Sequence, residues 1–300
     1  MNTKILEKAQ HVIDLRRYEA ENNAVNNKIK ALEDRDYKLL YESYTTLMIE
    51  DAKNGRNEGT QTKIVKEKLQ QKEKELGVSS TPQYFCPICQ DNGRVNGEYC
   101  VCLKKEINKI LIAQSGFSHL EDFKDARFDI FDNPEKMKKL YTKMKEWCYS
   151  DFKKNIIYIA GQTGVGKTHL MSCIANELIK KGQIITLTTS FAMNQDFVKC
   201  FSLRNTEEGN EILDKYLDCE VLFIDDLGTE LRKPNITNNY LYLILNERKM
   251  KKRPTIITSN LTLDDVRDYY DERVLSRLVD KDSSICLYLE GKDLRLQNKN

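Results

Sequence analysis

Apolar residues recur at helical spacing through the first 80 residues, which are otherwise polar and contain no proline. The repeat is carried by Ile5, Val12, Ile13 and Leu15, by Leu39, Leu40, Tyr44 and Leu47, and by Ile64, Val65 and Leu69. Turn-forming residues interrupt it between Asp51 and Gly59. The pattern predicts a helical hairpin or small bundle. Two interpretations stay open: a solvated helical spacer, or helices that bury an apolar face against another protein.

The pattern changes near residue 155, where short apolar runs begin to alternate with helical patterns. The runs cover residues 156–160, 184–188, 221–224, 255–258 and 285–289. Such alternation predicts an α/β fold with a parallel sheet. We therefore expect four parts: a helical partner-binding region over 1–80, a short cysteine-bearing segment over 81–115, a connector over 116–150 and an α/β domain over 151–300.

Composition excludes several classes of protein. The chain has 300 residues with 48 Lys and Arg against 46 Asp and Glu, so its net charge of +2 gives no long-range attraction for nucleic acid, although local basic patches are possible. No apolar run approaches the ~18 residues of a membrane span, and the N-terminus lacks a secretory signal. The nine cysteines are odd in number, which favours a reducing compartment. We expect a cytoplasmic protein with no membrane partner.

One glycine-rich segment predicts a phosphate site. The P-loop pattern G-x-x-x-x-G-K-[ST] is matched in full by Gly161, Gln162, Thr163, Gly164, Val165, Gly166, Lys167 and Thr168. A predicted strand precedes it and a predicted helix follows, so backbone N–H groups and the helix N-terminus would hold phosphate oxygens. Lys167 would reach the β- and γ-phosphates, and the Thr168 hydroxyl would help to bind magnesium. ATP and magnesium are the expected ligands.

Polar residues also follow two later strands. Asp225 and Asp226 end the run over 221–224, at the edge where open α/β sheets bind ligands. Asp225 suits magnesium, and Asp226 is placed to orient an attacking water. Asn260 follows the run over 255–258 and would polarise that water or contact the γ-phosphate, although an Asn at such a position taken alone is more often a turn residue. Arg273 and Arg277 are four residues apart and share one helical face. Two interpretations stay open: a role in the site, or ion pairs on a solvated helix face.

Four clustered cysteines predict a metal site. Cys86, Cys89, Cys100 and Cys102 form C-x2-C-x10-C-x-C, and four thiolates on short loops can surround zinc tetrahedrally. With four protein ligands the zinc would be structural. His119 is a possible substitute for one member of the tight second pair, and unrelated thiols or disulfides are the alternatives. The other five cysteines are expected to be small buried residues: Cys148, Cys173, Cys200, Cys219 and Cys286.

Together these motifs resemble the AAA+ ATPases of the DnaC/DnaI replicative helicase-loader group. The resemblance covers about residues 155–295, includes His169 and Leu170 after the P-loop, and extends nearly as closely to IstB-type transposition helpers. It implies a three-layer αβα domain with a five-stranded parallel sheet, and an ATPase that oligomerises. Only eleven residues follow Leu289, too few for the full C-terminal lid of larger relatives.

The resemblance also implies roles for individual residues. Lys167 and Thr168 match Walker A, with the nucleotide-binding segment continuing to His169. Asp225 and Asp226 match Walker B, Asn260 matches sensor 1, and Arg277 stands where an arginine finger would complete a neighbour's site, with Arg273 as the fallback. Many AAA+ proteins have Glu at the second Walker B position, so Asp226 predicts slow hydrolysis. Arg295 is a candidate for sensor 2.

Three functions remain open at this stage. The first is an ATP-dependent loader of a DnaB-type hexameric helicase onto single-stranded DNA, with residues 1–115 holding the helicase. The second is an IstB-type transposition helper, which the cysteine segment disfavours because it resembles the DnaI branch. The third is a nucleotide-binding adaptor with negligible hydrolysis. Two features are candidates for DNA contact. The first is the basic run over 248–253, whose cations could instead complement the end of a helix. The second is the set of Phe191, Phe197 and Phe201, which could instead be core residues.

Overall fold

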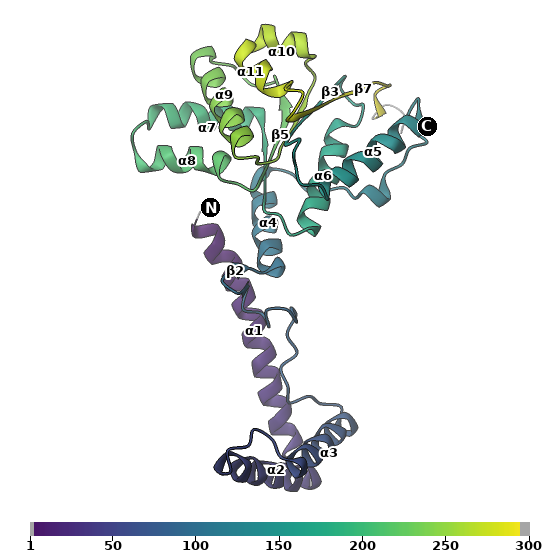
Figure 1. Cartoon of the computed structure of the whole chain (residues 1–300), viewed down its shortest axis with the longest axis vertical. Helices are drawn as coiled ribbons and strands as arrows, with labels where there is room; N and C mark the ends of the chain where they lie inside the picture. The colour runs from purple at the N-terminus through teal and green to yellow at the C-terminus, as the bar shows by residue number, and fades with distance from the viewer. Residues whose placement is uncertain (1–2, 295–300) are drawn as a thin grey trace. The chain divides into compact units, whose positions relative to one another are not determined.

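The computed structural model describes residues 3–294, which divide into two compact units. One unit runs from Gln10 to Cys102; the other combines the residues up to Ala9 with those from Leu103 onward. Figure 1 shows their elements in chain order from purple to yellow. Among the described residues, no helix has both the length and the apolar character that a membrane crossing requires.

The first unit is helical, as its apolar spacing predicts. It contains most of α1 (Thr3–Ala31), followed by α2 (Arg35–Lys53) and α3 (Thr60–Leu76). Asp34 caps α2 by accepting a hydrogen bond from the Tyr37 backbone N–H at 2.9 Å. Asp51 ends the hairpin by accepting from the Gly59 N–H at 2.6 Å and from the Thr62 hydroxyl at 2.5 Å. A small core of Ala31, Tyr37 and Leu69 lies where the three helices meet.

A short segment follows these helices and carries the cysteines. Its regular structure is a two-residue antiparallel ladder between β1 (Arg94–Val95) and β2 (Glu98–Tyr99). The helix α4 (Val101–Ser115) then leads from the first unit into the second.

The second unit is built on a parallel sheet of five strands in the order β4-β5-β6-β3-β7. Each of the five predicted apolar runs forms one of them: β3 (Ile156–Gly161), β4 (Ile185–Thr189), β5 (Val221–Leu227), β6 (Thr255–Ser259) and β7 (Ser284–Leu289). Strand β3 is buried along its whole length. A near-continuous apolar strand of this kind requires helices on both faces of the sheet.

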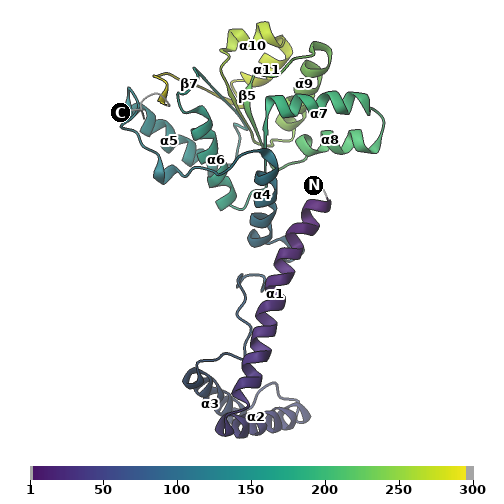
Figure 2. The ribbon, with the colours of Figure 1, turned by 180° about the vertical axis from the view of Figure 1, so that it is seen from behind.

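Helices cover both faces (Figures 1 and 2). Ile157 and Ile159 of β3 pack into the core that includes α5 (Pro134–Cys148) and α6 (Lys167–Lys180). Ile156 and Tyr158 point into the opposite core, as alternation along a strand requires. That second core is formed with α7 (Ser190–Ser202), α8 (Glu207–Leu217), α9 (Pro234–Met250), α10 (Leu263–Tyr269) and α11 (Glu272–Leu278). The predicted three-layer αβα arrangement is confirmed.

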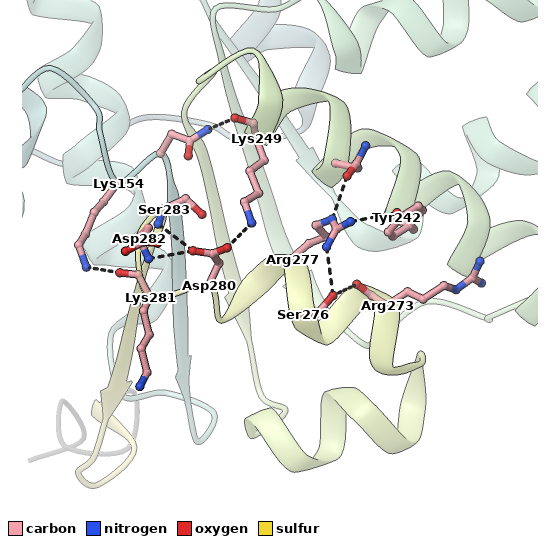
Figure 3. A network of polar contacts seen from close by, with 12 residues as sticks. Lys154, Tyr242, Lys249, Arg273, Ser276, Arg277, Asp280, Lys281, Asp282 and Ser283 are labelled. Atoms are coloured by element: carbon pink, nitrogen blue, oxygen red, sulfur yellow. Dashed lines mark hydrogen bonds and ion pairs between the residues drawn. The ribbon is translucent and has the colours of Figure 1, made fainter.

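Three of the five cations in the basic run at the end of α9 are engaged within their own unit. Arg248 is completely buried, and its guanidinium donates to the Tyr216, Cys219 and Pro254 carbonyls at 2.8, 2.9 and 2.8 Å. Lys249 pairs with Asp280 at 2.6 Å (Figure 3), and Arg253 pairs with Asp218 at 2.7 Å. Of the five cations considered for DNA contact, only Lys251 and Lys252 are exposed.

We expect Arg248 to stabilise this unit strongly. Arg248→Met should lower the free energy of unfolding by about 3 kcal/mol or more, because it leaves several buried carbonyl oxygens without donors. The sole tryptophan, Trp147, lies in the core of the same unit, so its fluorescence in a urea titration reports the change. The exposed neighbour provides the control: Lys251→Met should change stability by less than about 0.5 kcal/mol. Equal stability of the two variants would contradict a structural role for the buried guanidinium.

Candidate functional site

The glycine-rich segment forms the loop between β3 and α6. Gly164 and Gly166 have φ angles of +83° and +93°, in the left-handed region that favours glycine. Gly161 has a φ of +151°, and space restricts it further, because a Cβ atom there would lie 2.3 Å from the Leu289 carbonyl oxygen of β7. The loop therefore turns tightly against its neighbouring strand and leads directly into the first turn of α6.

Lys167 joins this loop to the end of β6. Its side chain is buried, and its ammonium group donates to the Gly161 and Gln162 carbonyl oxygens at 2.9 and 2.7 Å. It also donates to Asn260 Oδ1 at 2.8 Å. The structure thus brings together Lys167 and Asn260, two residues that are 93 positions apart in the sequence.

Asp225 lies beside the first turn of α6. The Thr168 hydroxyl donates to its two carboxylate oxygens at 3.1 and 3.3 Å, and the Thr258 hydroxyl donates to Oδ1. Burial raises the pKa of the Asp225 carboxyl above its usual value. A hydroxyl and a carboxylate in contact are oxygen ligands of the type that Mg²⁺ prefers, so Thr168 and Asp225 could hold that cation.

Asp226 has an unusual backbone. Its φ is +55°, and the pairing of β5 with β6 shifts register between Ile224 and Leu227. Its N–H donates to the Thr258 hydroxyl at 2.9 Å, and its carbonyl accepts from the Ser190 hydroxyl at 2.7 Å. A bulge of this kind re-aims a side chain out of regular strand alternation. The side chain of Asp226 therefore does not follow the regular alternation that would place it on the sheet face opposite to that of Asp225.

His169 faces the connector and α5. Its Nδ1 lies 3.0 Å from the Tyr141 hydroxyl, and burial lowers the pKa of the imidazole below its usual value. The connector bonds to the same helix, because the Glu121 N–H donates to the Ser172 hydroxyl at 2.8 Å and its carbonyl accepts from Asn176 at 3.0 Å. The His169 side chain thus contributes to the packing of α6.

The chain returns to the P-loop after β7. The Leu294 N–H donates to the Gly164 carbonyl at 3.0 Å, and a Cβ atom on Gly164 would lie 1.9 Å from Asp293 Oδ1. From the other side, the Phe131 ring lies 3.5 Å from a Cβ placed on Gly166. Sequence reasoning missed Asp293 and Phe131, which belong to no motif. Arg295, the candidate for sensor 2, lies outside the described residues.

The two arginines of α11 pack against α9 (Figure 3). Arg277 donates to Asn246 Oδ1 at 2.9 Å and to the Tyr242 hydroxyl at 3.1 Å, with its guanidinium 5.2 Å from the Tyr242 ring centre. Arg273 donates to Asn239 Oδ1 at 3.2 Å and pairs with Asp271 at 3.1 Å. Among the described residues, no hydrogen bond is observed from either guanidinium to Asp225 or Asn260. The finger role stays a prediction.

The four clustered cysteines meet in space. The Sγ atoms of Cys86, Cys89, Cys100 and Cys102 all lie within 4.8 Å of one another, and all four residues are buried. Sγ–Sγ distances are 3.8 Å from Cys86 to Cys100 and 3.3 Å from Cys89 to Cys102. Zinc–sulfur bonds of ~2.3 Å in a tetrahedron would set the sulfurs about 3.8 Å apart, so the donor set fits zinc.

Backbone contacts shape the cysteine loop. The buried Asp91 accepts from the Phe85 and Cys86 N–H groups at 2.8 and 2.9 Å, and the Gly93 N–H donates to Cys89 Sγ at 3.4 Å. His119, the possible substitute, is exposed and lies 3.0 Å from Glu121, and it is not a member of the cluster.

Two sequence-based expectations about apolar side chains need correction. The prediction that Cys286 is buried is wrong: this residue is exposed, because β7 lies at the edge of the sheet. Cys219 is half-buried. Of the three phenylalanines, Phe197 is a core residue, whereas Phe191 and Phe201 are 49% and 41% exposed.

Comparison with known proteins supports an ATP-binding protein. The sequence pattern of the family described as IstB-like ATP binding protein matches residues 103–300. Over 213 residues the chain is 30% identical to the uncharacterized protein YqaM of Bacillus subtilis, covering 67% of this chain and 66% of YqaM. It is 28% identical to the phage-like element PBSX protein XkdC of the same organism, covering 74% of this chain and 88% of XkdC.

Similarity extends to a protein named a replicative helicase loader and to solved structures. The replicative helicase loader DnaC of Buchnera aphidicola is 27% identical, covering 63% of this chain and 77% of DnaC. Among solved structures, a crystal structure of DnaI aligns with a TM-score of 0.45 at 24% identity, covering 58% of this chain and 90% of that one.

Proposed function

Because this chain belongs to the family of IstB-like ATP-binding proteins, we propose that it is an ATP-dependent loader of a DnaB-type replicative helicase onto single-stranded DNA. The observation that carries the proposal is the contact of Lys167 with Asn260 beside the Thr168–Asp225 pair. These four residues stand at the carboxyl ends of β3, β5 and β6, where parallel sheets bind ligands. Similarity to proteins named replicative helicase loaders supports the biological role.

Each residue of the site has a proposed task in phosphoryl transfer. Bound ATP and magnesium supply the γ-phosphoryl group and the cation that neutralises its charge. Lys167 would contact the phosphate oxygens, and Thr168 and Asp225 would hold the cation. Asp226 would orient the attacking water, and its short side chain would make hydrolysis slow. Asn260, which accepts a hydrogen bond from Lys167, would polarise that water or contact the γ-phosphate.

Assembly is proposed to complete the site. Arg277 lies on α11 and is held by Asn246 and Tyr242 of α9. A guanidinium held in this way on a neighbouring protomer is preorganised to neutralise charge on the transferred phosphoryl group. Arg273 is the fallback for this role. Loss of the γ-phosphate would then loosen the contact between protomers, which makes ATP a switch.

The remaining parts are proposed to bind the partners. Residues 1–115, with zinc stabilising the cysteine loop, would hold the helicase. The domain over 151–300 would contact single-stranded DNA, and its exposed Lys251, Lys252, Phe191 and Phe201 are available for phosphate and base contacts. Service to a transposase is the second candidate, favoured by the name of the matching family.

The nucleotide site is tested by three alanine variants. Lys167→Ala should abolish ATP binding in a calorimetric titration, because it removes the cation that contacts the phosphates. Arg277→Ala should bind ATP as the natural protein does but lose stimulated turnover by on the order of 10³-fold. Arg267→Ala, an exposed arginine of α10 paired with Asp268, is the matched control and should retain turnover. If Arg277→Ala hydrolyses ATP at the normal stimulated rate, the finger assignment is wrong, and Arg273→Ala is the next variant to measure.

The choice among functions is tested by partner capture. The full chain with ATP, immobilised and exposed to host lysate, should retain a replicative helicase that mass spectrometry identifies. Retention of a transposase instead would favour the transposition role. Phosphate release that stays at background with both helicase and single-stranded DNA present would favour a non-hydrolysing adaptor.

The zinc site is tested by elemental analysis. We expect about one zinc per chain, because four buried thiols of this spacing hold the metal tightly. Cys89→Ser should lose most of the metal and lower the melting temperature, whereas Cys286→Ser, at an exposed thiol outside the cluster, should lose neither. Less than about half an equivalent in the natural protein would reject the site.

A further inference from the structure

Helix α1 carries apolar side chains on two faces within the first unit. The buried face is made of Ile13 and the small residues Ala20, Ala24 and Ala31. A second set, which we call the outer stripe, consists of Leu15, Tyr18, Val25 and Ile29, whose exposed fractions are 48%, 66%, 56% and 57%. Four large apolar side chains exposed along one helix are more than scattered surface residues and indicate an interaction site.

The spacing of the outer stripe indicates what it binds. With Asn22 included, the positions advance by three, four, three and four residues, and on an α-helix they fall within an arc of about 80°. This is the spacing of the seam of a two-stranded coiled coil, in which a single Asn often occupies one core position and weakens the assembly. The complementary surface is therefore another helix with the same repeat.

Charges beside the outer stripe make it complementary to itself. Asp14, Glu19 and Glu21 flank its first half, and Lys28 and Lys30 flank its second half. Consider an antiparallel pair in which Tyr18 lies opposite Ile29 of the second copy. In this register Glu21 lies beside Lys28 of the second copy. The two-fold symmetry of the pair makes this attractive contact occur twice. A parallel pair would instead set Asp14 beside Glu19 twice, which is repulsive.

Contacts within the chain hold these charged groups at the rim. Arg17 pairs with Glu21 at 2.9 Å, and the Lys28 ammonium lies 4.3 Å from the Tyr41 ring centre and donates to its hydroxyl at 2.5 Å. The carboxylate and the ammonium retain capacity for a further partner, since each can make more than one hydrogen bond.

We propose that this protein self-associates through the outer stripe of α1, which pairs antiparallel with the same stripe of a second copy. The association needs neither ATP nor the arginines of α11, and it does not rest on the proposed loader function. Asn22 opposite Val25 keeps the pair weak and reversible. The same face therefore becomes available to another helix when the pair separates.

Sedimentation equilibrium of the full chain, reduced and without nucleotide, tests the proposal. The mass should rise from 35.0 kDa toward twice that value as the concentration increases through the micromolar range. Leu15→Ser with Val25→Ser should remain monomeric. The matched control is Leu39→Ser with Ile49→Ser, which changes two equally exposed residues of α2 and should associate normally. Asn22→Leu should strengthen association at least about tenfold, because it removes the polar group from the seam.

A charge exchange tests the orientation. Glu21→Lys should weaken the pair, and Glu21→Lys combined with Lys28→Glu should restore it, which only the antiparallel arrangement explains. Circular dichroism checks that each variant retains its helices. The proposal is overturned if the natural chain is monomeric throughout, or if the Leu15 and Val25 variant associates as tightly as the natural chain. Lys167→Ala should lose ATP binding yet still associate, so this test and that of the loader function can fail separately.

Discussion

A buried ammonium group determines the architecture of the proposed nucleotide site. Lys167 is surrounded by oxygens of Gly161, Gln162 and Asn260, and a buried cation is stable only when it is paired or hydrogen-bonded. Those oxygens come together because β3 and β6 are parallel neighbours, with Ala160 in register with Ser259. The strand order therefore places the two loops at one edge, and the AAA+ chemistry proposed for this chain depends on that register.

Local pattern predicts much of this fold and part of the site. The five strands, the P-loop and the cysteine cluster are predicted from the spacing of residues within short stretches of sequence, because these features depend mainly on residues that are near one another in the chain. Two contacts could not be predicted in this way: the hydrogen bond from the Thr258 hydroxyl to Asp225, and the position of Asp293 against Gly164. Each of them joins residues that are distant in the sequence. The exposure of Cys286 depends on strand order, which its own sequence neighbourhood does not encode.

The basic run at the end of α9 shows the same limit in another way. Arg248, Lys249 and Arg253 have the composition of a nucleic-acid patch, yet each is engaged by carbonyl or carboxylate oxygens of its own unit. Sequence does not distinguish a cation that binds phosphate from one that stabilises the end of a helix and the loops beside it. The burial of the side chain distinguishes the two roles. Arg248 is completely buried, so its role is structural.

The contacts of α6 with the connector have a mechanical consequence. Glu121 is bonded through its backbone to Ser172 and Asn176, and Tyr141 reaches His169, the residue immediately after Thr168. A displacement of α6 along its axis would break these hydrogen bonds. The connector therefore restrains the helix whose first turn begins at Lys167.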